Sequence, residues 1–500
     1  MKQKIYTKLS IAVIIAFALL RFFFALTHTV SGDACWHLSA AKFIAVRNKI
    51  PFSEGIGREE PFWPPPFFHF AAAMFYKILS LISTNAADTG IKLVSPISGT
   101  LIVAVAYLIM KKFFDEKTAF YSIIFLNFVP MFLDYSIFSY VDSTAALFSI
   151  LSVYLILNKR FVLSYFSLGI ALLSKYNAVF MFPMLIYLTY KLSDNKKQFY
   201  FRILFLVFVP FLISSFWFIR NLALLGNPFW PFLNGIFHGL AIGTSFNKIS
   251  FNHILSYNTY LSNYYELFGV PNGNVSLISF YNLSFLKPLL FVWVIGTLIF
   301  IYPFIRGLFR DKKDKNRIKE KNIFINSIYI IFLSYIFMLF IYLINTGIFG
   351  ARLILPIIPF MSVIWAEGIG SIKIKKIYLL IVVVIGIGFI IAETIKFSIS
   401  ANEWGIYAKD FAWVKENTKD TDLFYGNGQC LPYNINRLVV PHTVDIAFDK
   451  VDYVWVNQKW RIDFLMNEKT FNRVKNSDKL KVVYENTNSG TTIYKVGKFR

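Results

Sequence analysis

The sequence predicts a mainly α-helical, polytopic membrane bundle that carries a small C-terminal α/β domain outside the membrane. Of the 500 residues, 56% are hydrophobic and 19% are aromatic, a composition that excludes a soluble globular protein. Apolar runs long enough to cross a bilayer, about 18 residues or more, recur along the chain. After residue 395 the composition becomes polar, and short β-like runs alternate with helical stretches. We therefore expect a transmembrane domain over 1–395 and a second domain over 396–500.

The positive charge of the chain predicts its orientation. A formal net charge of +23 would suggest nucleic acid as the partner of a soluble protein. Here Lys and Arg gather in short loops on alternate sides of the apolar runs, and the loops assigned to the inside hold roughly twice as many as the others. We therefore expect no nucleic acid partner, a cytoplasmic N-terminus and an extracytoplasmic C-terminal domain in the plasma membrane.

The elements follow from the apolar runs in order. Leu9–Leu26 is an uncleaved first span, and Arg21 near its outer end is expected to snorkel outward. Phe67–Leu81, within the first external loop (28–92), is short and bounded by prolines, so we expect a re-entrant or interfacial helix. A long external loop is expected at 220–285. The total is about eleven transmembrane helices plus juxtamembrane helices. The remaining spans are expected at 93–110, 119–140, 143–157, 161–174, 177–190, 203–219, 286–304, 323–344, 353–369 and 377–395.

The C-terminal 105 residues have the pattern of a mixed α/β domain. Helices are expected at Glu403–Asn417 and near Trp460–Met466. Strands are expected at Asp422–Tyr425, Leu438–Val440, Tyr453–Val456, Lys481–Tyr484 and Thr492–Val496. The glycines at 426–428 lack the spacing of a nucleotide-binding fingerprint.

Ionisable residues at the ends of the spans are the candidate functional residues, because charge near the bilayer is costly. A carboxylate can act as a base, and cations can hold a phosphate leaving group. Simpler roles remain open: Asp142 as a helix cap, the basic residues as interfacial anchors, and His37 as a hydrogen-bond partner of Asp33 at i+4. The candidates expected on the outer face are Asp33, Glu59, Glu60, Asp142, Lys175, Arg220 and Arg352, with His37 and His69 nearby.

Cofactors and disulfides are less clearly indicated. No His, Cys, Asp or Glu cluster has the spacing of a metal site, so we expect no cofactor, and a divalent cation held by carboxylates stays an open alternative. Cys35 and Cys430 are the two cysteines, and both are expected outside. We expect two unpaired thiols; the alternative is a bridge that docks the tail onto the first loop.

Several motifs together resemble a known family, the C-type (GT-C) polytopic glycosyltransferases. These motifs occur in the family's order over residues 1–395. They are SGDACWHLSAAKFI with its acidic residue, the proline-rich EEPFWPPPFFHFAAAMFYKI, SYVDSTAALFSILSVYL, GIALLSKYNAVFMFP, SSFWFIRNLALLGNPFWP and FGARLILPIIPF. The nearest families in kind are the protein O-mannosyltransferases and the lipid A aminoarabinose transferases.

The resemblance implies an inverting enzyme that moves one sugar from a polyprenyl-phosphate donor, dolichyl or undecaprenyl, to a protein, lipid or glycan acceptor on the outer face. It implies Asp33 and Asp142 as the catalytic carboxylates. On the donor-phosphate side it implies Glu60, His37, Lys175, Arg220 and Arg352. This chain lacks the lysine that follows the glutamate in the aminoarabinose enzymes. The alternative function is a transporter or flippase of a polyprenyl-linked sugar, without transferase activity.

Overall fold

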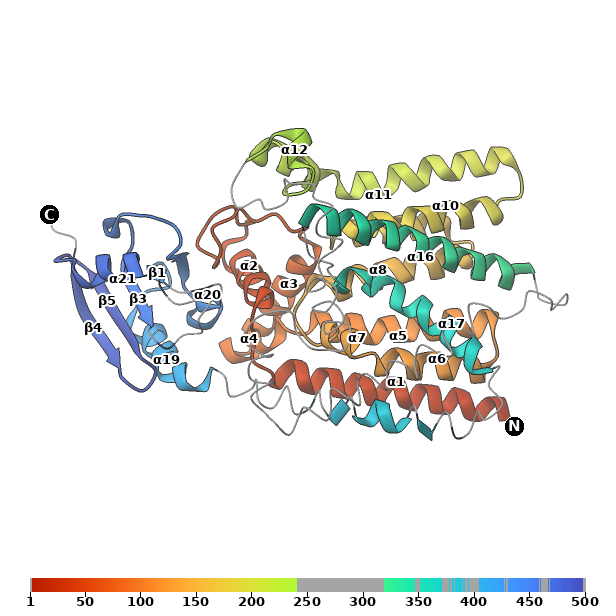
Figure 1. Ribbon diagram of the computed structural model, residues 1–500, viewed down its shortest axis with the longest axis horizontal. Helices are drawn as coiled ribbons and strands as arrows, with labels where there is room; N and C mark the ends of the chain where they lie inside the picture. Colours follow the sequence, from red (N-terminus) through yellow and green to blue (C-terminus); the bar gives the residue numbers. More distant parts are fainter. Residues whose placement is uncertain are drawn as a thin grey trace.

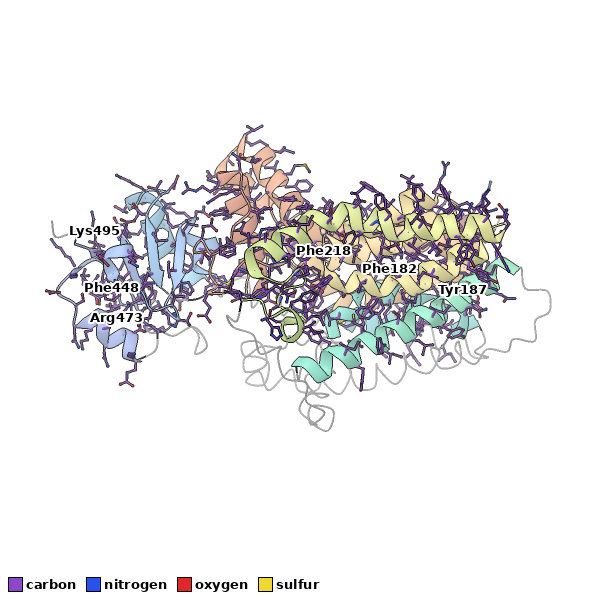
Figure 2. All side chains as sticks on the ribbon, turned by 90° about the horizontal axis from the view of Figure 1, so that it is seen from above. Phe182, Tyr187, Phe218, Phe448, Arg473 and Lys495 are labelled. Atoms are coloured by element: carbon purple, nitrogen blue, oxygen red, sulfur yellow. A yellow bond between two sulfur atoms is a disulfide. The ribbon has the colours of Figure 1, made fainter. Side chains whose placement is uncertain are left out.

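The computed structural model has two parts, a helical bundle and a smaller domain built on a β-sheet (Figure 1). It describes residues 2–240, 319–346, 351–370, scattered residues between 377 and 394, and 404–497 apart from 427, 429, 458, 460–465 and 467. Figure 2 shows the same division from above, with Phe182, Tyr187 and Phe218 in the bundle and Phe448, Arg473 and Lys495 in the sheet domain. The chain is mainly helical, as the sequence predicts, and it is a multi-pass membrane protein.

Most of the predicted spans within the described residues correspond to helices. The bundle contains α1 (Lys2–Thr27), α5 (Val94–Phe113), α6 (Glu116–Phe128), α7 (Pro130–Tyr135), α8 (Val141–Leu157), α9 (Phe161–Leu172), η1 (Tyr176–Met181), α10 (Phe182–Lys191), α11 (Lys196–Leu225), α16 (Lys319–Thr346), η5 (Ala351–Ile357) and α17 (Ile358–Gly370), and a short α12 (Asn234–Phe237) follows α11. The described residues include 5 helical stretches that are long and apolar enough to cross a membrane. The predicted count of about eleven is therefore not established.

Three predicted spans are wrong in detail, and one of them, expected at 353–369, opens with the 3-10 turn η5 before α17 begins. The span expected at 119–140 is divided, because Pro130 has no backbone N–H with which to continue α6 and instead begins α7. The span expected at 177–190 opens with the 3-10 turn η1 before α10 begins. The span at 286–304 lies outside the described residues, and the span at 377–395 is helical where it is described.

The bundle is apolar outside as well as inside. Phe208, Phe211 and Ile219 of α11 are exposed, as expected for side chains that face lipid. Arg21 does not snorkel outward, which corrects the sequence expectation. It is buried, and it donates to Ser136 Oγ at 2.8 Å and Asn127 Oδ1 at 2.7 Å. A buried guanidinium is retained where polar groups satisfy its donors, so Arg21 joins α1 to α6 and to the turn after α7.

Three shorter helices follow α1 and precede α5 in the chain: α2 (Asp33–Arg47), α3 (Phe67–Ser80) and α4 (Thr84–Gly90). They lie at the end of the bundle that adjoins the sheet domain (Figure 1). Helix α2 packs against α3 and is buried along most of its length. Helix α3 is 14 residues long. At 1.5 Å per residue it spans about 21 Å, less than the roughly 30 Å of the hydrocarbon core, so its length fits a re-entrant or interfacial helix.

The C-terminal domain is a five-stranded mixed sheet in the order β2-β1-β3-β5-β4. The strands are β1 (Leu423–Gly426), β2 (Leu438–Pro441), β3 (Tyr453–Asn457), β4 (Leu480–Asn486) and β5 (Thr491–Val496). Strands β2, β1 and β3 are parallel, and β5 is antiparallel to β3 and β4. All five strand positions agree with the predicted ones.

Helices of the C-terminal domain agree less completely with the sequence prediction. The helix expected over Glu403–Asn417 is the turn η6 (Gly405–Tyr407) and helix α19 (Ala408–Asn417). The helix expected near Trp460–Met466 falls on residues that lie mostly outside the described ones. Helices α20 (Leu431–Ile435) and α21 (Glu468–Lys475), as well as the turn η7 (Phe448–Lys450), were not predicted.

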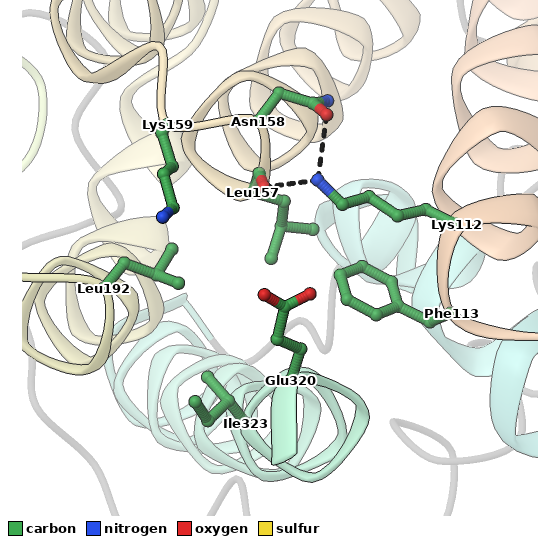
Figure 3. A pocket seen from close by; sticks show the side chains of 8 residues that line it. All are labelled: Lys112, Phe113, Leu157, Asn158, Lys159, Leu192, Glu320 and Ile323. Atoms are coloured by element: carbon green, nitrogen blue, oxygen red, sulfur yellow. Dashed lines mark hydrogen bonds between the residues drawn. The ribbon is translucent and has the colours of Figure 1, made fainter. Parts of the chain in front are cut away.

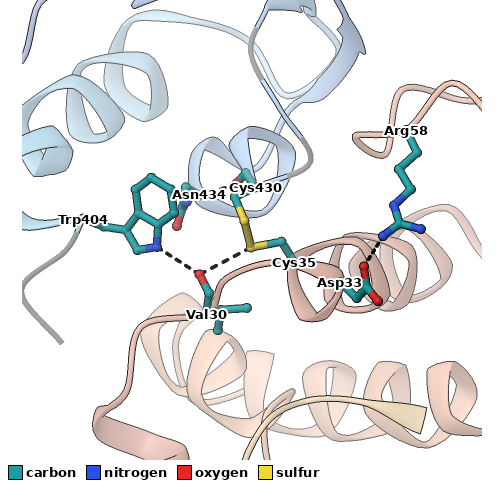
Figure 4. Close-up of a disulfide and its surroundings, with 7 residues drawn as sticks. All are labelled: Val30, Asp33, Cys35, Arg58, Trp404, Cys430 and Asn434. Atoms are coloured by element: carbon teal, nitrogen blue, oxygen red, sulfur yellow. Dashed lines mark hydrogen bonds and ion pairs between the residues drawn. A yellow bond between two sulfur atoms is a disulfide. The ribbon is translucent and has the colours of Figure 1, made fainter. Parts of the chain in front are cut away.

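A disulfide joins the two parts of the chain. Cys35 on α2 is bonded to Cys430 at the start of α20, with a Cα–Cα distance of 4.9 Å (Figure 4). The expectation of two unpaired thiols was therefore wrong, because folding brings together residues 395 positions apart. Beside the bridge, Trp404 Nε1 donates to the Val30 carbonyl at 2.9 Å. The C-terminal domain thus packs directly on the segment that contains Asp33.

Candidate active site

Asp33 lies in the first turn of α2, immediately after Gly32, the N-cap residue. Gly32 has φ of +58°, which L side chains rarely adopt, and a Cβ added there would lie 3.5 Å from Tyr140 Oη. The N-terminus of a helix carries partial positive charge and therefore favours a carboxylate. The backbone thus presents Asp33 at a helix end that stabilises its ionised form.

Both carboxylate oxygens of Asp33 are paired with arginines. Arg58 Nη2 donates to Oδ1 (Figure 4). Arg352 Nη1 donates to Oδ2 at 3.0 Å. Burial acts to raise the pKa of Asp33, but the charges of Arg58 and Arg352 outweigh it and hold the pKa far below its ordinary value. The Asp33 side chain is 30% exposed, so this ionised carboxylate is accessible.

Arg58 is a site residue that the sequence analysis missed. Besides Asp33 it contacts Glu60, with Nη1 3.2 Å from Oε1, and its guanidinium lies 4.2 Å from the centre of the Trp36 ring. The signal was present, because Arg58 is a lone cation directly before the two glutamates of the proline motif. Arg58 is a cation two residues before Glu60, whereas the motif of the aminoarabinose transferases has a lysine after the glutamate.

Asp142 and Lys175 form a second ion pair. Lys175 Nζ donates to Asp142 Oδ1, and the Asp142 side chain is only 2% exposed. Arg352 lies within electrostatic range of Asp142 as well as Asp33, and its guanidinium is 5.7 Å from the Tyr140 ring centre. Asp142 is in the first turn of α8, so its expected position at a helix start is correct. Its side chain, however, contacts Lys175, which lies outside α8.

His37 and His69 form a buried pair next to Asp33. His37 Nδ1 lies 3.0 Å from His69 Nε2. Burial and the neighbouring His69 lower the pKa of His37 well below its ordinary value, against the raising effect of Asp33, and burial lowers the pKa of His69 to about 3. Both rings are therefore neutral at pH 7, and one donates the hydrogen bond to the other. The expected role of His37 in binding the donor stays a prediction.

Arg220 is placed differently from the other candidate cations. Its guanidinium donates to the carbonyls of Phe62 at 3.1 Å and Pro51 at 2.9 Å, and it lies 4.5 Å from the Trp217 ring centre. Tyr176 Oη and Trp217 Nε1 each donate to the Trp63 carbonyl at 3.3 Å. These contacts fix the backbone just before the three prolines. The expected contact of Arg220 with the donor phosphate stays a prediction.

A pocket at the other end of the bundle also contains charged residues. It lies between the C-terminal ends of α5 and α8 and the start of α16, away from the sheet domain (Figures 1 and 3). Lys112 Nζ, on its wall, donates to the Leu157 carbonyl at 2.6 Å and to Asn158 Oδ1 at 2.9 Å, so it satisfies the end of α8. Glu320 and Lys159 also line it. We do not assign this pocket to the chemistry of Asp33.

The structure thus brings together Asp33, Glu60, Arg58 and Arg352, with Asp142 and Lys175 adjacent. Within the described part of the chain, no group of three or more His, Cys, Asp or Glu side chains is arranged to hold a metal ion. The arrangement offers two partly exposed carboxylates, Asp33 and Glu60, and the two guanidinium groups of Arg58 and Arg352. This set of groups suits proton removal beside a bound anion.

Comparison with protein families gives a match over part of the bundle. The model of the dolichyl-phosphate-mannose-protein mannosyltransferases matches residues 64–217. This segment runs from the proline motif through α3, the ion pair of Asp142 with Lys175, and most of α11. No curated protein matches the chain by sequence.

Comparison with solved structures gives matches over nearly the whole chain. ArnT from Cupriavidus metallidurans, solved with undecaprenyl phosphate bound, is 15% identical with a TM-score of 0.50, and the match covers 97% of each chain. The Archaeoglobus fulgidus oligosaccharyltransferase is 13% identical with a TM-score of 0.50, covering 90% of this chain and 69% of that one. The mycobacterial arabinofuranosyltransferase AftD is 11% identical with a TM-score of 0.54, covering 97% and 40%. At these identities each match is a likeness of fold.

Proposed function

We propose that this chain, which has the fold of the C-type polytopic glycosyltransferases, is an inverting transferase. It moves one sugar from a polyprenyl-phosphate donor to a protein, lipid or glycan acceptor on the outer face of the plasma membrane. The observation that carries the proposal is the accessible Asp33 carboxylate held between Arg58 and Arg352. ArnT of Cupriavidus metallidurans, which has a similar fold, binds undecaprenyl phosphate, and this supports the same class of donor here.

The proposed reaction is a single displacement at the anomeric carbon. The acceptor hydroxyl oxygen forms a bond to that carbon while the bond from the carbon to the phosphate oxygen breaks. The electron pair of the broken bond leaves with the polyprenyl phosphate, and the hydroxyl proton passes to Asp33. General-base catalysis of this kind contributes about 10²–10⁴-fold in rate. Attack opposite the leaving group inverts the anomeric configuration.

The arginines have a role that changes during the reaction. The phosphate gains one negative charge as it leaves, so a guanidinium that contacts it stabilises the transition state more than the ground state. Arg58 and Arg352 each have one partner in Asp33, and an incoming phosphate competes for them. As they engage the phosphate, the pKa of Asp33 rises toward its ordinary value and Asp33 becomes a stronger base.

The remaining candidates have supporting roles in this proposal. Asp142 and Lys175 form an ion pair, with Asp142 buried and Lys175 partly exposed, that lies beside Arg352 and fixes the local charge. Arg220 holds the proline-motif backbone through two carbonyls, so we assign it to positioning. No described feature favours the alternative of a transporter or flippase.

The test uses purified full-length protein in detergent with a series of polyprenyl-phosphate sugars and candidate acceptors. We expect release of free polyprenyl phosphate and a glycosylated acceptor with inverted configuration, read by mass spectrometry and NMR. Detergent leaves no sealed compartment, so a transporter would yield no covalent product. Movement of the lipid-linked sugar in vesicles, without any product in detergent, would refute the proposal.

A further inference from the structure

The first loop contacts the edge of the C-terminal sheet close to Arg58. Val439 N, in edge strand β2, donates to the Gly55 carbonyl at 2.7 Å, and Ile56 forms a parallel β-bridge with Val439. Ile56 is 3% exposed and belongs to a buried cluster with Trp36 and Phe62, against which Leu438 packs. The loop is thus fixed to the C-terminal domain two residues before Arg58.

Gly55 permits this contact. A Cβ added to Gly55 would lie 2.9 Å from Val439 N, closer than real Cβ atoms approach, and 3.0 Å from Val439 O, which is tighter than most real contacts. The atoms it would meet belong to backbone, which cannot move aside as a flexible side chain can. Any side chain at position 55 therefore displaces the loop from β2 or β2 from the loop.

The C-terminal domain also contacts the helix that carries Asp33. Cys35, two residues after Asp33, is bonded to Cys430. About two turns of α2 beyond this point, Lys42 Nζ donates to the Tyr433 carbonyl at 3.1 Å and to Asn436 Oδ1 at 2.6 Å. One domain thus contacts both the element that carries the carboxylate and the loop that carries its arginine partner.

We propose that the C-terminal domain is a positioning element of the active site: edge strand β2, through Val439 and Gly55, holds the first loop so that Arg58 reaches Asp33. Val439 and Gly55 are positioning residues, since they act through Arg58. The relevance to catalysis rests on the proposed function, but the geometric coupling does not. The groups that face Asp33 are His37 from α2, Arg58 from the loop, Arg352 from η5 and Tyr140 just before α8, and Asp142 lies near Arg352 and Tyr140.

The test measures protonation of Asp33 without turnover. Purified full-length protein in detergent is labelled with dicyclohexylcarbodiimide, which modifies protonated carboxyl groups, over a series of pH values. Mass spectrometry after a fixed labelling time gives the pH at which Asp33 is half-labelled, and this midpoint lies above the pKa of Asp33 and shifts with it because the labelling rate follows the protonated fraction. Arg58→Gln removes an opposite charge and should raise this midpoint by about one pH unit or more. Gly55→Ala and Val439→Pro, which deletes the donor to Gly55, should raise it in the same direction while Arg58 is intact.

The control is Gly405→Ala, because a Cβ there meets nothing within 4 Å, and it should leave the midpoint unchanged. Each variant is first checked for an intact Cys35–Cys430 bridge by thiol labelling without reductant, which reports folding of the interface. A midpoint that rises in Arg58→Gln but not in Gly55→Ala or Val439→Pro would overturn the positioning by β2. An unchanged midpoint in all three would overturn the Arg58–Asp33 coupling. Neither result depends on whether the chain is a glycosyltransferase.

Discussion

Replacing Asp33 by Asn should change transfer and donor-phosphate binding in opposite directions. The substitution keeps the size of the side chain but removes the group that accepts the proton. We expect transfer to fall by at least about a hundredfold, the lower range for loss of a general base. The protein should still fold, because the Asp33 side chain is 30% exposed and lies at the end of α2 rather than in its packed centre.

The change in affinity follows from the two ion pairs. A polyprenyl phosphate must displace Asp33 from Arg58 and Arg352, and each partly exposed pair is worth about 0.2–1 kcal/mol. In Asp33→Asn both guanidinium groups lose their ionised partner at position 33, whereas Glu60 stays beside Arg58, so binding gains up to about 2 kcal/mol. Since 1.4 kcal/mol is a factor of ten, affinity for undecaprenyl phosphate alone should rise by up to about thirtyfold.

The assay combines transfer kinetics with a binding titration of undecaprenyl phosphate on the same preparations. Glu59→Gln is the matched control, because it removes an exposed carboxylate from the same loop, and both quantities should stay close to those of the unmodified chain. If Asp33→Asn retains more than about a tenth of the transfer rate, Asp33 is not the base. If it binds undecaprenyl phosphate more weakly, the proposed competition for the arginines is wrong.

Two further predictions concern the ion pair of Asp142 with Lys175 and the topology. Lys175→Met leaves Asp142 buried without its cation and should destabilise the protein by about 3 kcal/mol. The double variant Asp142→Asn with Lys175→Met should recover most of that loss. The measurement is the order of the thermal unfolding midpoints of the variants in one detergent. Equal midpoints for the single and double variants would contradict this reasoning. Single cysteines at the exposed positions Asn85 and Lys197 report whether α3 crosses the membrane. If α3 does not cross it, Asn85→Cys should react with an impermeant maleimide in intact cells, and Lys197→Cys should react only after permeabilisation. The opposite pattern would mean that α3 crosses the membrane.

Much of the architecture could be predicted from the sequence, because its signals are local. Apolar runs mark helices in lipid, and alternating short runs marked all five strands of the C-terminal sheet. Charges are costly near a bilayer, so Asp33, Asp142 and Arg352 were visible as candidates before any contact was known. Local patterns were weaker at helix ends. Pro130, for example, interrupts an apolar run that otherwise reads as one span.

The sequence by itself thus determined the class of the protein and most residues of the candidate site, whereas the tertiary structure decided which of those residues meet. Arg352 and Asp33 are 319 positions apart, and Cys35 and Cys430 are 395 apart, so no local pattern relates them. Arg58 stands beside two glutamates in the first loop, and only the folded structure shows that it pairs with Asp33, next to the contact of its loop with the C-terminal sheet. A charged residue beside an apolar run can be recognised from the neighbouring sequence, because burying its charge is costly. Which residue then pairs with that charge depends on how distant segments pack.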